Sequence, residues 1–343
     1  MMRLVVILIS VLSFSASYAQ ALNSASNPVP LSARAAPLAS QSLLLDITKI
    51  NPSTLVAVGE RGHILLSSDG QQWQQASVPV QSTLTAVYFV DETHGWAVGH
   101  DATILATIDG GLSWQIQQYL PKVEKPLLDV LFSDKDNGIA IGAYGLFYRT
   151  HDGGQHWAVE YHNELLYPED QEYLAELKSQ DQEAYLDEQS SILPHFNRVS
   201  VDGNALYMAG EIGLLAKSDD FGVSWKKLDE IYTGSFYDVN RTQADNLIAV
   251  GLRGHVFRRA KNTESWQSVN TGVTALLSSI VLAGDNRLFI LGNNGVLLAS
   301  QDDGSTFTKH LQKDGKALIG GVWFNNKLIV VSDVGIKTIN VTK

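Results

Sequence analysis

Short apolar stretches alternate with clusters of turn-forming residues along most of the chain, and this pattern predicts a protein built from β-strands. The segment from Trp96 to Trp114 shows the pattern most clearly. Ala97-Val98 end one strand, Gly99–Ala102 form a tight turn, and the β-branched stretch Thr103–Thr107 forms the next strand. We therefore expect an antiparallel hairpin at this position.

A second turn follows this hairpin and has the Asp-box pattern Ser/Thr-x-Asp-x-Gly-x-x-Trp, which recurs in other copies of the repeat. In Thr107–Trp114, the Asp109 carboxylate can accept backbone N–H groups of its own turn, and Trp114 can anchor the turn in the core. We therefore expect a structural role for the Asp-box residues, which are Asp69, Asp109, Asp152, Asp220 and Asp302 with Trp73, Trp114, Trp157 and Trp225. A fifth copy has lost the Asp and retains Trp266.

The hairpin turn recurs at a nearly constant interval. Its first glycine stands at Gly59, Gly99, Gly142, Gly210, Gly251 and Gly292, and Ser332 takes the seventh position. Successive positions are 40 to 43 residues apart, except that 68 residues separate Gly142 from Gly210. A fixed period of this size indicates a repeat architecture, and the long interval indicates one insertion.

Four short antiparallel strands in about 41 residues are typical of one propeller blade. The sequence therefore predicts an all-β, seven-bladed β-propeller over residues 43–343. The expected blades are 43–81, 82–123, 124–163, 195–232, 233–273, 274–315 and 316–343. The last blade has only three predicted strands, and we expect some part of residues 22–42 to supply the fourth, because closure would cover an exposed strand edge.

The extra residues between the third and fourth blades, 164–194, predict a helix or a short helical hairpin. Apolar residues recur at helical spacing in 169–188, and nine Asp or Glu residues accompany Lys178 in the insertion. The insertion could be a solvated excursion or a docking element. The order of strands places it on the same face as the Gly turns, and we expect it to overhang that face.

The N-terminal sequence predicts export. Arg3, the apolar run Leu4–Leu12 and the small residues that end at Ala19 are typical of a secretory signal peptide over 1–19, cleaved near Ala19. Residues 20–42 then form an extended leader, and we expect a periplasmic location. The chain has no Cys, which excludes disulfides and Cys-ligated metals. Its formal net charge of −11 argues against nucleic-acid binding.

The Gly turns place one ring of side chains on a single face of the predicted propeller. Loops on such a face usually carry function, and Arg is enriched in protein contacts. The candidate partner-binding residues are Arg61, Asp101, Tyr144, Arg253 and Asn294 in the turns, and Tyr173 in the insertion.

The sequence contains no recognisable catalytic constellation, phosphate-binding loop or zinc signature, so we expect no catalytic residues, no metal and no cofactor. We also expect a monomer that does not itself span the membrane. Two alternatives stay open, because Asp boxes also occur in glycan-active proteins. One is a secreted sialidase-like glycoside hydrolase, and the other is a propeller that binds glycans without catalysis.

Three stretches resemble the Ycf48/HCF136 family of photosystem II assembly and stability factors: Val98–Trp114, Gly142–Trp157 and Val58-Gly59-Glu-Arg-Gly62-x-Ile. Members of this family are seven-bladed propellers. The resemblance implies a non-enzymatic scaffold that holds a membrane or envelope protein during assembly, at a surface to which Arg61 and Arg253 correspond. The acidic insertion and the lack of a lipid-bearing Cys depart from the cyanobacterial pattern. In a host without photosynthesis, the partner would be another envelope complex.

Overall fold

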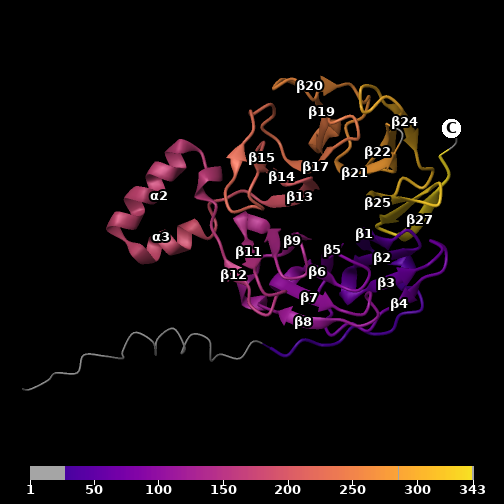
Figure 1. The fold of residues 1–343 in the computed structure, drawn as a ribbon, viewed down its shortest axis with the longest axis horizontal. Helices are drawn as coiled ribbons and strands as arrows, with labels where there is room; N and C mark the ends of the chain where they lie inside the picture. The colour runs from indigo at the N-terminus through magenta and orange to yellow at the C-terminus, as the bar shows by residue number, and fades with distance from the viewer. Residues whose placement is uncertain (1–27, 285, 342–343) are drawn as a thin grey trace, which may run out of the picture.

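The computed structural model describes residues 28–284 and 286–341, so the predicted signal peptide lies outside the described residues. The described chain forms a ring of seven antiparallel sheets around a central axis, with two helices outside the ring (Figure 1). The predicted seven-bladed propeller is confirmed. Each sheet is one blade, and its first strand lies next to the axis.

Blades 1 to 6 have four strands each and blade 7 has three. Blade 1 contains β1 (Leu44–Asn51), β2 (Thr54–Gly59), β3 (Ile64–Ser67) and β4 (Gln74–Gln75). Blade 2 contains β5 (Leu84–Phe89), β6 (Gly95–Gly99), β7 (Thr103–Thr107) and β8 (Gln115–Gln118). Blade 3 contains β9 (Leu127–Phe132), β10 (Gly138–Gly142), β11 (Phe147–Thr150) and β12 (Ala158–Val159).

Blade 4 contains β13 (Phe196–Asp202), β14 (Ala205–Gly210), β15 (Leu215–Ser218) and β16 (Lys226–Lys227). Blade 5 contains β17 (Phe236–Arg241), β18 (Leu247–Gly251), β19 (Val256–Arg259) and β20 (Trp266–Val269). Blade 6 contains β21 (Leu277–Gly284), β22 (Arg287–Gly292), β23 (Val296–Ser300) and β24 (Thr308–Leu311). Blade 7 contains β25 (Leu318–Phe324), β26 (Lys327–Ser332) and β27 (Gly335–Ile339).

The two glycines of each turn serve different purposes, as blade 1 shows. Gly59 has an extended backbone, with φ −175°, but a Cβ there would lie 2.2 Å from the Leu43 carbonyl oxygen. Gly62 has φ +71°, a left-handed conformation that side chains resist. The first glycine therefore allows a close approach of the chain that enters the blade, and the second allows the turn itself.

A buried apolar cluster fills the interface between each pair of neighbouring blades. At six of these interfaces an aromatic side chain from the Asp-box region joins the cluster. These side chains are Trp73, Trp114, Trp157, Trp225, Trp266 and Phe307. At the interface of blades 6 and 7, the cluster instead receives Trp323 from β25 with Ile339 and Val341.

Polar side chains near the start of the inner strands link successive blades. Each inner strand has a register shift after its first residue, as between Leu44 and Asp46 in β1. The Asp46 carboxylate accepts the Val87 N–H of blade 2 (3.0 Å), and the Thr85 hydroxyl of blade 2 donates to the Leu127 carbonyl of blade 3 (2.7 Å).

This alternation continues around the ring as far as blade 7. Asp129 accepts from Val199 (2.8 Å), Asn197 donates to Phe236 (2.7 Å), Asp238 accepts from Ile280 (2.8 Å) and Ser278 donates to Leu318 (3.0 Å). The corresponding positions of blade 7 are Ile319 and Gly320, which have no polar side chain.

The leader does not complete blade 7 with any of its described residues. Residues 28–42 form no β-strand and instead cross the Gly-turn face of blades 1 and 2, where the Ala33 N–H donates to the Val78 carbonyl (2.9 Å). The expectation of a fourth strand from the leader is therefore wrong for residues 28–42, and residues 22–27 lie outside the described residues. Blade 7 meets blade 1 by apolar packing that includes Leu44, Ile47 and Val331.

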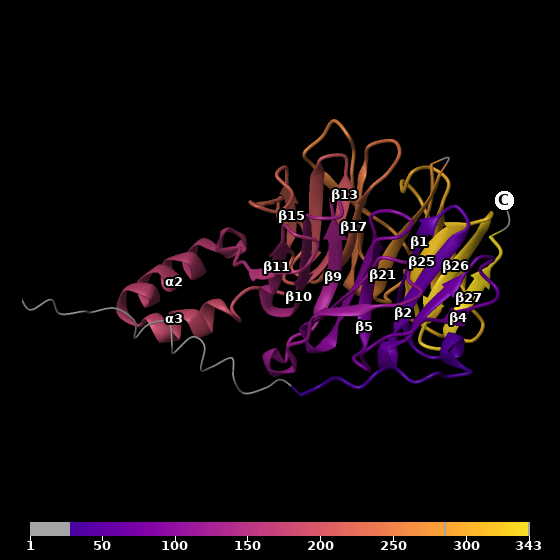
Figure 2. The same cartoon turned by 60° about the horizontal axis from the view of Figure 1, so that its bottom comes forward.

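The insertion forms the predicted helical hairpin, α2 (Pro168–Gln180) and α3 (Gln182–Gln189). Asp181 caps α3 by accepting the N–H groups of Glu183 and Ala184, both at 3.0 Å. Both views show the hairpin projecting outward beside blades 3 and 4 (Figures 1 and 2). The expectation that it overhangs the Gly-turn face is therefore wrong, and Leu174 and Tyr185 attach the hairpin to the apolar cluster between blades 3 and 4.

Candidate protein-binding face

The Gly turns display one side chain per blade on a single face of the ring. In blades 1 to 6 the second residue of the turn adopts a left-handed conformation, with φ between 52° and 62°. These residues are Arg61, Asp101, Tyr144, Ile212, Arg253 and Asn294. The repeated backbone geometry explains why the predicted residues share one face, although they are spread over five blades.

Arg61 and Arg253 are both exposed on this face but lie in blades that are not neighbours. The Arg61 side chain is 78% exposed, and its Nε lies 4.0 Å from a Glu60 carboxylate oxygen. Arg253 is exposed and forms no ion pair with any residue that the structure describes. Both guanidinium groups are available to a carboxylate or carbonyl group of a partner.

Tyr144 connects the turns to the insertion. Its ring meets the His195 ring edge-on at 4.6 Å, and the Lys125 Nζ lies 5.7 Å from its centroid. The same ammonium group donates to the Ser190 carbonyl (2.5 Å), and burial lowers the pKa of Lys125. The return segment of the insertion is therefore fixed to the Gly-turn face at blade 3.

The other predicted residues differ in how available they are. Asp101 accepts a hydrogen bond from the Ser82 hydroxyl (2.5 Å), so its carboxylate is partly committed within the fold. Asn294 is exposed. Tyr173 is 46% exposed on α2, which places it on the projecting hairpin and away from the turns (Figure 1).

The described part of the leader adds a feature that the sequence pattern did not predict. It runs along the Gly-turn face (Figure 2), where the Gln75 amide donates to the Arg34 carbonyl and the Gln81 amide to the Ser32 carbonyl, both at 2.9 Å. Its larger apolar side chains are exposed, since Val29, Leu31 and Leu38 are 88%, 67% and 63% exposed. The pattern Pro28-Val-Pro30 is typical of extended backbone and was the available signal.

The Asp boxes lie on the opposite face, and their carboxylates are occupied within their own turns. The Asp109 carboxylate accepts from the Thr107 hydroxyl (2.8 Å), the Ser113 N–H (3.0 Å) and the Ser113 hydroxyl (2.6 Å). Burial opposes ionisation of Asp109, but these hydrogen bonds outweigh it and lower the pKa. Such carboxylates are poorly suited to act as general acids at neutral pH.

A cluster of charged side chains in the central channel was missed by the sequence reasoning. Arg198 lies between carboxylates of other blades, 3.3 Å from an Asp129 oxygen and 3.6 Å from an Asp46 oxygen, and Asp238 faces it as well. Burial raises the pKa of both Asp129 and Asp238 to about 6, although Arg198 lowers each. The sequence did contain a signal for this cluster, because the charged residues occupy the same position, the third, of the inner strand in four of the repeats.

The channel beside this cluster has a volume of about 310 Å³. Its chemistry is that of a structural cluster, because each of the three carboxylates also accepts a backbone N–H of the following blade. Within the part of the chain that the structure describes, no group of His, Asp and Glu side chains has the geometry to hold a metal ion. The described helices also include none with the length and apolar character needed to cross a membrane.

Comparison with known proteins connects this fold with one family. Residues 65–124 match the family model described as photosynthesis system II assembly factor YCF48. The chain is also 27% identical over 238 residues to the photosystem II assembly protein Ycf48 of Thermosynechococcus vestitus. The chain is Ycf48-like. Residues 65–124 run from β3 to the end of blade 2, and they include the turn of Asp101 and the Asp box of Asp109.

The first Ycf48 relative is matched over 69% of this chain, which spans 61% of the length of that relative. A lipoprotein form, the photosystem II assembly lipoprotein Ycf48 of Picosynechococcus, is 28% identical over 67% of this chain and 61% of its own. A solved structure of YCF48 bound to a D1 peptide superimposes with a TM-score of 0.68 at 18% identity. That match covers 92% of this chain and all of the other. The Ycf48-like chain therefore shares its whole propeller fold with that structure.

Proposed function

We propose that this protein is an exported, non-enzymatic assembly factor of the Ycf48 type, which holds a membrane-protein partner at its Gly-turn face. The match of residues 65–124 to the YCF48 family model carries the proposal, since its relatives are named as assembly proteins. The solved YCF48 structure with a similar fold is bound to a D1 peptide, which supports peptide binding by a propeller of this shape.

The Gly-turn face supports the same role by its geometry. Seven blades present their turns on one side, the second turn residue of blades 1 to 6 points outward, and the leader adds exposed apolar side chains. Arg253 supplies an exposed charge without a partner in the described chain. A surface that combines apolar contacts with free guanidinium groups is typical of protein recognition.

Export to the periplasm is part of the proposal. The signal-peptide pattern of residues 1–19 supports it, as does the lipoprotein name of one relative. The partner is then a membrane protein whose periplasmic segments reach the Gly-turn face. We infer that the protein acts as a monomer, because the display of one turn per blade needs no second copy.

The test is site-specific photo-cross-linking in the native host. A photo-reactive residue replaces Arg253 in one strain, and replaces Ile108 in a control strain, since Ile108 is 71% exposed beside an Asp box on the opposite face. We expect the Arg253 position to capture one membrane protein and the Ile108 position to capture little of it. Equal capture from both faces would contradict the proposed surface. Hydrolysis of a sialoside or glucan by the purified protein would contradict the non-enzymatic role.

A further inference from the structure

We propose a second binding site, separate from the Gly-turn face: the open edge of blade 7 takes an extended peptide segment of another protein as its fourth strand. Strand β27 pairs with β26 on one side, and no described strand pairs with its other side. Ser332 and Gly335 form the hydrogen-bonded pair that closes this hairpin, and such pairs alternate along an antiparallel ladder with pairs whose N–H groups point away from each other. Ile329 and Thr338 form a pair of the second kind, so the Thr338 N–H lies on the outer edge. An unpaired edge of this kind is a template for strand addition.

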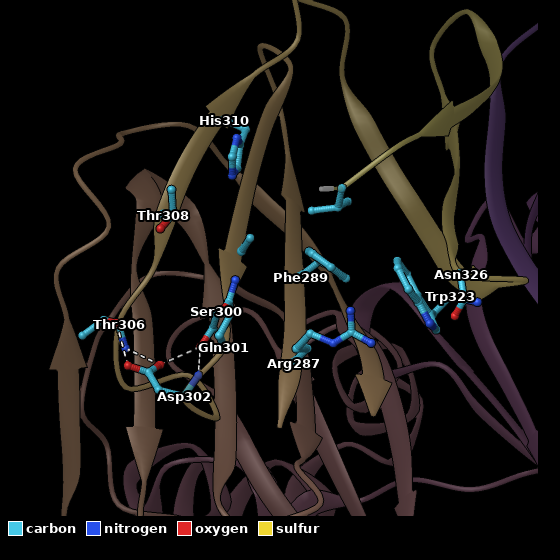
Figure 3. Close-up of a pocket in the computed structure, with 12 residues that line it drawn as sticks. Arg287, Phe289, Ser300, Gln301, Asp302, Thr306, Thr308, His310, Trp323 and Asn326 are labelled. Atoms are coloured by element: carbon cyan, nitrogen blue, oxygen red, sulfur yellow. Dashed lines mark hydrogen bonds between the residues drawn. The ribbon is translucent and has the colours of Figure 1, made fainter. Parts of the chain in front are cut away.

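A groove of about 960 Å³ lies between β22, β23 and β24 of blade 6 and β25 of blade 7, and Val341, two residues after β27, also lines it. Figure 3 shows Phe289 and Trp323 along the groove, with His310 toward one end, and the two rings stack on each other. The groove lies at the one blade interface that receives no Asp-box aromatic in the described structure, because blade 7 has neither an Asp box nor an outer strand. The free volume therefore corresponds to the side chains that a fourth strand would contribute.

The lining of the groove presents a stacked pair of aromatic rings, against which a further aromatic side chain can pack. The Phe289 and Trp323 rings lie 5.6 Å apart with an interplanar angle of 26°, and the Arg287 guanidinium lies 5.1 Å from the Trp323 ring. Thr308 and His310 of β24 provide polar groups at the rim. An aromatic residue of the added strand would complete this interface as Trp114 does between blades 1 and 2.

Local charge favours an acidic segment as the occupant. Residues 305–343 contain six Lys and two Asp, whereas the whole chain has a formal net charge of −11. Asp302 also lines the groove, but its carboxylate already accepts hydrogen bonds from the Ser300 and Thr306 hydroxyls. The blade 7 side of the ring is therefore basic, and the acidic helical hairpin lies on the other side of the molecule (Figure 1). The partner segment that fits is extended, carries one aromatic side chain and has an excess of carboxylates.

The course of the leader argues against the chain's own N-terminal residues as the occupant. With rising residue number the leader passes from Gln81, at the start of blade 2, to Gln75 of β4, and then to Gly335 of blade 7. The described leader therefore begins on the blade 2 side and reaches blade 7 only near Ser40, at the Gly335 turn.

The probes are three fluorescent peptides derived from the chain's own outer strand in blade 2. The first copies residues 113–118, Ser-Trp-Gln-Ile-Gln-Gln. The second carries Gln115→Glu and Gln118→Glu, and the third carries Trp114→Ala. Fluorescence anisotropy with the full chain measures Kd for each. We expect the acidic peptide to bind most tightly, and the peptide without Trp to bind about tenfold more weakly than the first.

Two variants of the protein test the site from different sides. Thr338→Pro removes the outward N–H of β27, and Ala299→Trp fills the groove from blade 6 without changing the edge. We expect each to weaken binding of the acidic peptide about tenfold at an unchanged melting temperature. Arg253→Ala, on the Gly-turn face, should leave the Kd unchanged, which separates this site from the proposed function.

Cross-linking tests where the peptide binds. The chain contains no native Cys, so a single introduced Cys can be labelled specifically. A benzophenone attached at Thr338→Cys should label the acidic peptide, and the unlabelled peptide should compete. No saturable binding, equal binding of the peptide without Trp, or unchanged binding in both variants would overturn the proposal. Cross-links from position 338 to residues 20–27, or to a second copy of the chain, would overturn it as well.

Discussion

Replacing Arg198 by Met removes the cation that faces three carboxylates in the central channel. The Arg198 side chain is 24% exposed, and its guanidinium nitrogens lie 3.3 Å from an Asp129 oxygen and 3.6 Å from an Asp46 oxygen. Met has a similar length and no charge. The substitution therefore leaves Asp46, Asp129 and Asp238 without a compensating charge while changing the packing little.

The magnitude follows from these distances. One ion pair at about 4 Å is worth ~4 kcal/mol at an effective dielectric constant near 20, which is an upper bound because desolvation opposes it. Removing one partner of a buried pair typically costs about 3–5 kcal/mol, since the other charge is left buried. We expect Arg198→Met to lower the free energy of unfolding by about 3–5 kcal/mol at pH 8.

The same substitution should cost less at pH 5. The pKa values of Asp129 and Asp238 are about 6 even with Arg198 present, and loss of the cation would raise them further. Both carboxyl groups are then largely protonated at pH 5, and their mutual repulsion is relieved. We expect the loss at pH 5 to be roughly half of the loss at pH 8.

Urea unfolding followed by tryptophan fluorescence, at pH 8 and at pH 5, measures both values. Arg253→Met serves as the control, because it removes the same group from an exposed position on the Gly-turn face. A loss below about 1 kcal/mol at pH 8 would refute the reasoning, as that value is typical of an exposed pair. An equal loss at both pH values would show that protonation of the carboxyl groups between pH 8 and pH 5 does not change their interaction with Arg198.

Three further predictions test other parts of the fold. Burial raises the pKa of Asp129 from 3.8 to about 6, so the folded state binds this proton more tightly and the free energy of unfolding falls as the pH rises between these values. Asp129→Asn should flatten that decline, as measured by urea unfolding from pH 4 to pH 7. Trp114→Ala should lower the free energy of unfolding by about 3–5 kcal/mol, because it empties a site that is 5% exposed and removes the 3.0 Å hydrogen bond from the indole N–H to the Gly111 carbonyl. Calorimetry of the variant measures this loss, and a loss under about 1 kcal/mol would contradict an anchoring role. Gly59→Ala should destabilise the fold by more than about 2 kcal/mol, because its Cβ would lie 2.2 Å from a backbone oxygen. Gly272→Ala has open space around it and should cost only about 1 kcal/mol, for its left-handed backbone. A lower melting temperature for Gly59→Ala than for Gly272→Ala would support this reasoning, and equal values would contradict it.

The repeat made most of the fold predictable. The spacing of Gly59, Gly99 and their counterparts located six blades, because each of these turns has a glycine where the chain entering the blade passes within contact distance, and Ser332 continued the same spacing in blade 7. The helical hairpin was predictable from the apolar spacing around Tyr173 and Leu177. Its direction was not, because strand order determines the face of an insertion but not the angle at which it leaves the ring.

The candidate sites were predictable only in part. The turn residues were located because their position is local to the repeat. The cluster of Arg198 with Asp46 and Asp129 combines residues 69 or more positions apart, whose proximity depends on closing the ring. The path of residues 28–42 depends on long-range bonds such as that from Ala33 to Val78, which leave no periodic pattern in the sequence. The open edge of β27 likewise became evident only when these residues were placed elsewhere.

The polar links between inner strands give assembly of the ring a direction along the chain. Each link joins a blade to the one synthesised next, so blades can be added in order as the polypeptide emerges. The links from Asp46 and Thr85 span 41 and 42 residues, and the link from Asp129 spans 70 because the insertion intervenes. Only the final step joins segments from opposite ends of the sequence, Leu44 with Val331, and this step has the greatest loop-closure entropy. Among the described residues, the start of β25 contributes no such link to blade 1, and the bond from Lys49 to the Trp323 carbonyl (3.3 Å) is exposed to solvent, so the last contact to form is also the first expected to open. Amide protons along the seam between β1 and β25 should therefore exchange before those between any other two blades.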